Sequence, residues 1–160
     1  MKNNKLCRGK AVDFNQADKL ARKLKQGKQR IVFTNGCYDL LHPGHLHLLR
    51  QARKLGDALI VGINSDSSVK RIKEQGRPIM KLNERIEMLS ELRCVDFIVP
   101  FSHTTPAVLI AKIKPDVLVK GSDWKSDAII GREHAKRVIR AKLKKGFSTT
   151  DIIKRIRKNS

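Results

Sequence analysis

The sequence predicts one α/β domain built on a doubly wound parallel sheet. Short, continuous apolar runs recur along the 160 residues, and segments with helical spacing of apolar residues separate them. Strands that are apolar on both faces and alternate with helices are typical of a parallel sheet with helices on both sides. Ligands of such sheets bind outside the carboxyl ends of the strands. The segments that follow the strands are therefore the first candidates for a functional site.

The elements follow from these patterns in order. Apolar runs predict strands at 31–33, 58–63, 95–99, 116–119 and, more weakly, 138–143. Amphipathic spacing predicts helices over 14–26, 44–55, 83–92, 104–113, 127–137 and 149–158. We interpret residues 1–28 as a basic, helical N-terminal extension and residues 29–160 as the main domain.

Composition and cysteine content predict a cytoplasmic protein. No apolar run approaches the roughly 20 residues that a membrane-spanning helix needs, and the N-terminal residues lack the apolar stretch of a signal peptide. Cys7, Cys37 and Cys94 form neither a CxxC pair nor an even disulfide set, so we expect free thiols in a reducing compartment. For Cys37, packing beside a strand end is the favoured interpretation, and a reactive thiol is the alternative.

The formal net charge of +20 raises the question of nucleic acid. Residues 1–30 contain ten Lys and Arg and residues 132–158 contain eleven, whereas residues 31–131 contain fourteen against eleven acids. The basic excess therefore lies in the flanks, and the seven aromatic residues form no interleaved platform for stacking bases. We expect a solvated basic surface that helps to attract anionic substrates, and we do not expect nucleic acid as a partner.

The most informative stretch is Phe33-Thr-Asn-Gly-Cys-Tyr-Asp-Leu-Leu-His-Pro-Gly-His45, which runs from a predicted strand into a predicted helix. His42 and His45 are three residues apart, so both imidazoles lie on one helix face. Pro43 and Gly44 suit the first helical turn and a close backbone approach to a ligand. Because helix N-termini bind anions, the stretch predicts a nucleotide phosphate site.

Two other roles fit the histidine pair less well. A metal site needs a third and a fourth ligand at suitable spacing, and no HExxH pattern or Cys/His cluster supplies them. We therefore expect no metal site made by protein ligands alone. The other alternative is that one histidine caps the helix while the other only packs.

The segment Asp39-Leu-Leu-His-Pro-Gly-His45 resembles the HxGH signature of the cytidylyltransferase-like nucleotidyltransferases. Three further stretches agree in order: Val61-Gly-Ile-Asn-Ser-Asp66 followed by Arg77-Pro78, Leu118-Val-Lys-Gly-Ser-Asp123, and Gly146-Phe-Ser-Thr-Thr-Asp-Ile-Ile153. With Phe33–Asp39 they narrow the resemblance to the adenylyltransferase domain that makes ADP-heptose from D-glycero-β-D-manno-heptose 1-phosphate. The resemblance covers roughly residues 14–156. It implies a Rossmann-like fold and makes residues 29–160 a nucleotidyltransferase domain.

The resemblance also implies roles for individual residues. It makes His42, His45 and Lys73 catalytic, with Lys70 as the alternative lysine facing the phosphates. The nucleotide-binding residues that it implies are Thr34, Asn35, Gly36, Asp39, His42, His45, Lys70, Arg93, Gly121, Asp123, Ser148, Thr149 and Thr150. Arg85, like Arg93, is expected near the phosphates, and an exposed helix charge is the alternative for both. For Ser148–Thr150 the alternative is simple N-capping.

Two departures from the family's pattern bear on specificity and on a loop. Lys120-Gly-Ser-Asp-Trp124 stands where the typical enzyme has Lys-Gly-Gly-Asp-Tyr, and the tryptophan resembles that of glycerol-3-phosphate cytidylyltransferases. The usual Gly-Gly turn before the last strand is replaced at 134–140 by His-Ala-Lys-Arg-Val-Ile-Arg. Many family members are fused to a sugar kinase, so a stand-alone form implies a separate kinase upstream. The family also implies a homo-oligomer.

The sequence thus predicts transfer of AMP from ATP to a sugar 1-phosphate, with release of pyrophosphate and with Mg²⁺ accompanying the ATP. The attacking phosphate oxygen is ionised near neutral pH, because the second phosphate pKa is about 6, so no general base is required. The first alternative is a cytidylyltransferase acting on glycerol 3-phosphate or a similar alcohol phosphate. The second is a basic nucleic-acid-binding module that retains a nucleotide-binding fold.

Overall fold

Six parallel strands form the sheet of the computed structural model, which describes residues 9–122, 129–142, 144 and 146–159. The strands are β1 (Lys10–Ala11), β2 (Ile31–Gly36), β3 (Ala58–Asn64), β4 (Phe97–Phe101), β5 (Val117–Gly121) and β6 (Arg137–Ala141). Their order is β1-β4-β3-β2-β5-β6, and every neighbouring pair is parallel. The chain winds outward from β2 to β4 and then returns to the other side of β2 for β5 and β6. The predicted doubly wound fold is confirmed, and its switch point lies between β2 and β5.

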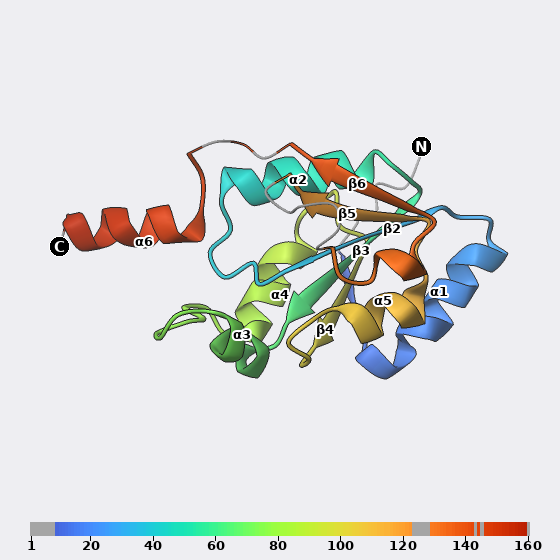
Figure 1. Ribbon diagram of the computed structural model, residues 1–160, viewed down its shortest axis with the longest axis horizontal. Helices are drawn as coiled ribbons and strands as arrows, with labels where there is room; N and C mark the ends of the chain where they lie inside the picture. The colour runs from blue at the N-terminus through green and yellow to red at the C-terminus, as the bar shows by residue number, and fades with distance from the viewer. Residues whose placement is uncertain (1–8, 123–128, 143, 145, 160) are drawn as a thin grey trace, which may run out of the picture.

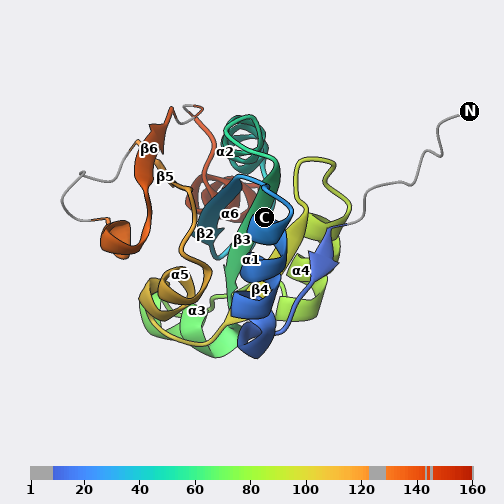
Figure 2. The same cartoon turned by 90° about the vertical axis from the view of Figure 1, so that its right-hand side faces the viewer.

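Helices cover both faces of this sheet, as Figure 1 and Figure 2 show from two directions. These covering helices are α1 (Ala17–Gln26), α2 (Pro43–Arg53), α3 (Asp66–Ile72), α4 (Leu82–Ser90) and α5 (Ala107–Ile113); the last helix, α6 (Thr149–Lys158), lies apart from them. α1 and α5 pack on the face that carries Phe33 and Ile60. α2 and α4 pack on the opposite face, against Val61 and Ile98. These two apolar clusters fix the carboxyl ends of the strands relative to the start of α2.

Residues 9–28 are the described part of the predicted N-terminal extension, and they contribute to the core. β1 pairs with β4, and α1 buries Ala17, Ala21 and Leu24 in the cluster that it shares with α5. The helix predicted over 14–26 is confirmed as a short 3₁₀ turn, η1 (Phe14–Gln16), that leads into α1. Asp13 caps this turn by accepting the Asn15 N–H at 2.8 Å.

The prediction of a helix over 127–137 is wrong for residues 129–137, the part of this range that the structure describes. Gly131 has φ of 83°, a left-handed conformation that interrupts a regular helix, and only the short 3₁₀ turn η3 (Arg132–His134) follows. Ile129, which contributed to the helical pattern, is buried against the α5 side of the sheet. β6 then confirms the weak strand signal at 138–143.

Two smaller differences concern the middle of the chain. β4 begins at Phe97, two residues later than predicted; just before it, the Asp96 carboxylate accepts the N–H of Leu59 in β3 at 2.8 Å. α3 was not predicted; its seven residues begin after Ser65, whose hydroxyl accepts the Ser68 N–H.

The last helix differs from the others in its packing. α6 has no buried side chain, and Figure 1 shows it extending away from the sheet and its covering helices. None of the helices in the described ranges is long and apolar enough to cross a membrane.

Candidate active site

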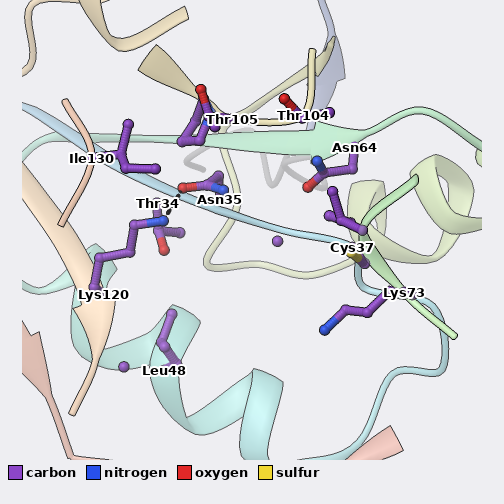
Figure 3. A pocket seen from close by; sticks show the side chains of 14 residues that line it. Thr34, Asn35, Cys37, Leu48, Asn64, Lys73, Thr104, Thr105, Lys120 and Ile130 are labelled. Atoms are coloured by element: carbon purple, nitrogen blue, oxygen red, sulfur yellow. Dashed lines mark hydrogen bonds between the residues drawn. The ribbon is translucent and has the colours of Figure 1, made fainter. Parts of the chain in front are cut away.

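Two adjoining cavities open where the strands end. The strand-end cavity, shown in Figure 3, has a volume of about 320 Å³. It is lined by Thr34, Asn35, Gly36, Cys37, Leu48, Asn64, Ile72, Lys73, Thr104, Thr105, Pro106, Lys120, Gly121 and Ile130. The histidine pocket has a volume of about 520 Å³ and is lined by Cys37, Asp39, His42, His45, Ile72, Lys73, Glu74, Arg77, Ser148, Thr149 and Thr150. Because Cys37, Ile72 and Lys73 line both, one ligand can extend from one cavity into the other.

His42 is the N-cap of α2, and its capping contact decides which ring nitrogen faces a ligand. Its Nδ1 accepts the Gly44 N–H at 3.1 Å and, more weakly, the His45 N–H at 3.4 Å. An accepting Nδ1 carries no proton, so in the neutral ring the proton is on Nε2. Burial lowers the pKa of His42, which favours this neutral form. The capping role and a donor role toward a ligand are therefore compatible.

His45 lies in the first turn of α2, and its imidazole ring packs against that of His42. The two imidazole rings are stacked, with centroids 3.8 Å apart and planes inclined by 23°. Burial, reinforced by the neighbouring His42, lowers the pKa of His45 to about 3, so the ring is neutral at pH 7. Its Nδ1 is a buried polar atom without a hydrogen-bonding partner in the described part of the chain. Unpaired buried atoms of this kind are uncommon in folded proteins.

Two glycines allow the histidines this close arrangement. A Cβ on Gly44 would lie 2.9 Å from atoms of the His42 ring and 3.1 Å from the Phe147 carbonyl oxygen. A Cβ on Gly36 would lie 3.1 Å from the ring of Tyr38, which is buried beside His45 at a centroid distance of 5.0 Å. Tyr38 is a supporting residue that sequence reasoning missed. The sequence feature that could have indicated this packing is Gly36, two positions before Tyr38.

The structure distinguishes the two candidate lysines. Lys73 lines both cavities, and Figure 3 shows its side chain directed into the strand-end cavity. Lys70 is exposed in the last turn of α3 and lines neither of them. Of these two lysines, Lys73 is therefore the one in position to contact a ligand in the cavities.

Asn35 and Lys120 meet across the switch point of the sheet. They come from the ends of the neighbouring strands β2 and β5, and the Lys120 ammonium donates a hydrogen bond to Asn35 Oδ1 (Figure 3). Thr34, Gly36 and Gly121 line the same cavity. The structure thus brings the predicted β2 residues together with the β5 end.

The loop between β4 and α5 contributes lining residues that sequence reasoning missed. Thr104, Thr105 and Pro106 line the strand-end cavity and come from the carboxyl end of a third strand. The rule that ligands bind at strand ends was the available signal. No motif marked these residues individually.

Asp39 lines the histidine pocket, but its carboxylate is occupied by the protein. Arg77 Nε donates to Oδ2 at 2.5 Å, and the backbone N–H groups of Ile79 and Met80 donate to Oδ1 at 2.8 and 2.9 Å. Burial raises the pKa of the Asp39 carboxyl, but the hydrogen bonds from Met80, Ile79 and Arg77 outweigh it and lower that pKa. In this arrangement Asp39 holds residues 77–80 in place, and Arg77 lines the pocket.

The structure does not place the two predicted arginines at the phosphates. Arg85 is fully buried and donates to the carbonyl oxygens of Cys37, Asn64 and Met80 and to the Asp66 carboxylate. Its charge is therefore used to join α4 to the loops after β2 and β3. Arg93 is exposed and precedes β4, so it lies at the amino end of a strand whose carboxyl end forms the cavity. Neither arginine lines the two cavities, so this geometry does not favour the prediction that they contact the phosphates.

The start of α6 forms the far wall of the histidine pocket. Ser148 is the N-cap; its hydroxyl accepts the Asp151 N–H at 3.0 Å and lies 2.6 Å from Asp151 Oδ2. The capping alternative therefore holds for Ser148. Thr149 and Thr150 follow in the first turn and line the pocket beside it. Their hydroxyl and backbone N–H groups suit an anion.

The remaining predicted residues divide into three cases. Asp123, like Trp124, lies outside the described residues. Cys37 and Cys94 are free cysteines, and burial raises the pKa of the Cys37 thiol, which favours the unreactive protonated form. Within the described ranges, no group of three or more His, Cys, Asp or Glu side chains is arranged to hold a metal ion.

Comparison with curated proteins finds relatives whose sequences are about half identical to that of this chain. Bifunctional protein HldE of Helicobacter hepaticus (strain ATCC 51449 / 3B1) is 51% identical over 140 residues, which cover 88% of this chain and 29% of that protein. Bifunctional protein HldE of Campylobacter concisus (strain 13826) is 52% identical over 133 residues, which cover 83% of this chain and 28% of that protein. The chain therefore spans less than a third of the length of these relatives.

Solved structures share the fold. The lipopolysaccharide core biosynthesis protein from Thermoplasma volcanium GSS1 matches with a TM-score of 0.62 and 28% identity, over 74% of this chain and 99% of that one. Pantoate-beta-alanine ligase from Francisella tularensis, complexed with beta-gamma ATP and beta-alanine, matches with a TM-score of 0.60, over 91% of this chain and 76% of that one. At 18% identity the second likeness concerns the fold alone.

The resemblance carried by the HxGH segment and three later stretches is confirmed by these relatives and by a family model. That model, described as cytidylyltransferase-like, matches residues 33–155, which include both histidines and the start of α6. The chain therefore belongs to the cytidylyltransferase-like family and is a nucleotidyltransferase.

Proposed function

We propose that the chain transfers AMP from ATP to D-glycero-β-D-manno-heptose 1-phosphate, giving ADP-heptose and pyrophosphate. The observation that carries the proposal is the histidine pocket. Two stacked, neutral imidazoles, the Lys73 ammonium and the first turn of α6 surround one cavity that opens into a second. The relatives named HldE and a neighbour described as a lipopolysaccharide core biosynthesis protein support a sugar phosphate as acceptor.

The reaction requires positioning and charge stabilisation more than proton transfer. A phosphate oxygen of the sugar attacks the α-phosphorus of ATP, and the bond from that phosphorus to the oxygen of pyrophosphate breaks. Because the nucleophile is already ionised, the electron pair it needs is available without a base. Neutral His42 donates from Nε2–H, and His45 lies directly behind it, so neither ring needs to titrate during the transfer.

Lys73 and the start of α6 contact different phosphates of the substrates. Lys73, in the wall shared by the two cavities, faces the reacting phosphate. The backbone N–H groups at the start of α6 and the hydroxyls of Thr149 and Thr150 face the departing pyrophosphate across the histidine pocket. The strand-end cavity takes the organic group next to the reacting phosphate. In-line geometry of this kind supplies much of the rate enhancement in phosphoryl transfer.

Mg²⁺ is proposed to accompany the ATP. It is bound in such sites mainly by substrate phosphates and water, with few protein carboxylates. The histidine pocket fits this pattern, because Asp39 is held by Arg77 and Glu74 is the other acid in its lining. The ion would neutralise charge on the triphosphate. The protein residues would still supply orientation and the donors at the α-phosphorus.

A cytidylyltransferase acting on glycerol 3-phosphate or a similar alcohol phosphate is the second candidate. The observation that favours it is the tryptophan in Lys120-Gly-Ser-Asp-Trp124, a sequence feature outside the described residues. Both candidates share the histidine pocket and differ in base and acceptor.

A paired substrate assay separates the candidates. The full chain is incubated with Mg²⁺ and each combination of ATP or CTP with heptose 1-phosphate or glycerol 3-phosphate, and pyrophosphate is measured. We expect release with ATP and heptose 1-phosphate, and loss of that release in His45→Ala. Release with CTP and glycerol 3-phosphate instead would establish the second candidate. Absence of release from every combination contradicts both.

The proposed reaction also implies an upstream partner. A sugar 1-phosphate arises by phosphoryl transfer to the anomeric hydroxyl, so we propose that a sugar kinase activity supplies it. Adding a heptose kinase, its substrate and ATP to this chain should then give ADP-heptose in one vessel.

A further inference from the structure

Two carboxamide side chains, those of Asn35 and Asn64, reach the strand-end cavity from neighbouring strands. β2 and β3 pair in a register that sets Asn35 opposite Gly62, so Asn64, two residues farther along β3, lies on the same face of the sheet. Both residues line the cavity, as Figure 3 shows. A carboxamide has a nitrogen that donates and an oxygen that accepts hydrogen bonds. The atom that faces the cavity therefore decides what each residue can bind.

The orientation of Asn64 follows from a chain of hydrogen bonds that ends at a carbonyl group. The Ser68 hydroxyl donates to the His103 carbonyl oxygen at 2.7 Å, and that oxygen can only accept. Because the hydroxyl has one proton, the Ser68 oxygen must accept from Asn64, so the Asn64 atom that lies 2.9 Å from it is the nitrogen Nδ2. Asn64 is buried, with 3% of its surface exposed, which keeps this arrangement out of water. The atom that it offers to the cavity is then Oδ1, a hydrogen-bond acceptor.

Lys120 fixes Asn35 in the opposite sense. β5 pairs with β2 so that Leu118 lies opposite Phe33, and Lys120 and Asn35 follow two residues later on their strands. An ammonium group only donates, so the Asn35 atom that it contacts is Oδ1. Figure 3 shows Nδ2 on the side of the carboxamide that is turned away from Lys120. Asn35 therefore offers a hydrogen-bond donor.

We propose that Asn35 and Asn64 select the sugar phosphate by its ring hydroxyls, with Asn64 Oδ1 accepting from one hydroxyl and Asn35 Nδ2 donating to a hydroxyl oxygen. The inference rests on the proposed function, because it requires a substrate with several hydroxyl groups. A hydroxyl group both donates and accepts, so two neighbouring hydroxyls match one fixed acceptor and one fixed donor. Lys73 lines the same cavity and faces the phosphate of that substrate.

The nucleobase is the competing occupant of the strand-end cavity. Proteins commonly hold bases by stacking them on aromatic side chains, and no aromatic residue is among the lining residues that the structure describes. Thr104 and Thr105 instead add two hydroxyl groups to the lining. Each of these hydroxyls can donate or accept. This lining suits a sugar ring better than a flat base.

Ser68 acts as a positioning residue in this arrangement. It is fully buried and lines neither cavity, so it does not touch the substrate. Its hydroxyl joins the Asn64 amide to the loop after β4. Without that hydroxyl the amide loses the contact that sets which of its atoms faces the cavity. Ser68→Ala should therefore weaken binding of the sugar phosphate without removing any group that contacts it.

A cycle of variants and substrates tests the proposal in the full chain. The unmodified chain, Asn35→Ala, Asn64→Ala and Ser68→Ala are each assayed for pyrophosphate release with ATP, Mg²⁺ and heptose 1-phosphate. The assay is repeated with analogues of heptose 1-phosphate that each lack one ring hydroxyl. Asn83→Ala is the control, because it removes an exposed carboxamide on α4 that lines neither cavity. Thermal denaturation checks that each variant folds.

We expect Asn35→Ala and Asn64→Ala each to raise the KM for heptose 1-phosphate at least about tenfold, while the KM for ATP changes less than about twofold. In the unmodified chain, one deoxy analogue should cost a similar factor for each amide. Combining that analogue with the matching variant should add little further loss, because the hydrogen bond is already gone. Ser68→Ala should raise the same KM by a smaller factor, and Asn83→Ala should leave it unchanged.

Two results overturn the proposal. One is an unmodified chain that accepts every deoxy analogue as well as heptose 1-phosphate, a result that needs no variant to fold. The other is a rise in the KM for ATP in place of the rise for the sugar phosphate, which would assign the cavity to the nucleotide.

Failure of the proposed reaction gives a different pattern. If the substrate assay identifies glycerol 3-phosphate as the substrate, the same variants are measured with it and with its deoxy analogue, and an unchanged KM overturns the role of the amides. Calorimetric titration of each phosphate into the chain with α,β-methylene-ATP measures binding without turnover. Release of pyrophosphate from heptose 1-phosphate that is insensitive to both amides contradicts this inference alone. Absence of binding by both phosphates contradicts the proposed function and the inference together.

Discussion

The imidazole rings of His42 and His45 lie face to face, with centroids 3.8 Å apart. Two charged imidazoles could not be held so closely, and burial lowers the pKa of both. The cap fixes the His42 proton on Nε2. We therefore propose that the pair acts as neutral hydrogen-bonding groups at the start of α2 and not as an acid and its base.

Replacing His45 with alanine tests this role. Loss of one preorganised donor in such a site typically costs about 3 kcal/mol, so we expect kcat to fall at least about 10²-fold. Steady-state pyrophosphate release measures it, and far-UV circular dichroism checks that the fold survives. A variant that keeps most of its turnover would exclude the proposed role.

The depressed pKa of His45 also predicts a pH dependence of stability. The pKa is about 3 in the folded protein, against about 6.5 for an ordinary histidine. The folded state then binds fewer protons, so stability is fully present above about pH 6.5 and falls as the pH drops toward 3. We expect His45 to account for a loss on the order of 2 kcal/mol in the free energy of unfolding between about pH 7.5 and about pH 5. Urea unfolding should show a smaller loss in His45→Ala, and equal losses would contradict the assignment.

Gly44→Ala should impair catalysis although alanine favours a helix. The new Cβ would lie 2.9 Å from the His42 ring, so the ring or the Phe147 backbone must move. Displacements of this kind cost much of a positioned site's rate, and we expect kcat/KM to fall at least about tenfold. Gly27→Ala is the control, since the nearest atom to its Cβ is 3.4 Å away. Equal activity of the two variants would show that the close contact at Gly44 is unimportant.

Lys73→Ala should lower kcat at least about tenfold, because it removes the charge that faces both cavities. Lys70→Ala removes the same charge three residues earlier, from an exposed position on α3, and should leave kcat unchanged. Steady-state kinetics on both variants measures the difference. If Lys70→Ala were the more damaging, the assignment would have to be reversed.

Arg85→Ala should destabilise the fold. It leaves three carbonyl oxygens and the Asp66 carboxylate without their buried donor, a change that typically costs about 3–5 kcal/mol. Arg93→Ala, at an exposed position, should change stability by no more than about 0.5 kcal/mol. Chemical denaturation of both variants measures this. Unchanged stability of Arg85→Ala together with a raised KM for the nucleotide would restore its predicted role at the phosphates.

The predictable parts of this protein are those encoded locally. The strands β2 to β6, α2 and the position of His42 at its start follow from apolar runs, Pro43 and residue spacing, whereas the two-residue strand β1 was not predicted. The helix predicted over 127–137 failed because amphipathic spacing does not reveal a backbone reversal, which in the structure occurs at Gly131. Ile129 is a loop residue that packs into the core. From the sequence alone, an apolar residue in a buried loop cannot be distinguished from one on the buried face of a helix.

The site shows the same division. The fold class and the histidine pair, with the anionic ligand that we expect for them, could be inferred from the sequence because they depend on neighbours a few residues apart. That Lys73 faces the cavities, that Asn35 meets Lys120 and that Arg85 is buried among backbone carbonyls became clear from the folded structure. These roles depend on which strand ends lie side by side and which charges folding withdraws from water. Spacing along the chain does not carry that information.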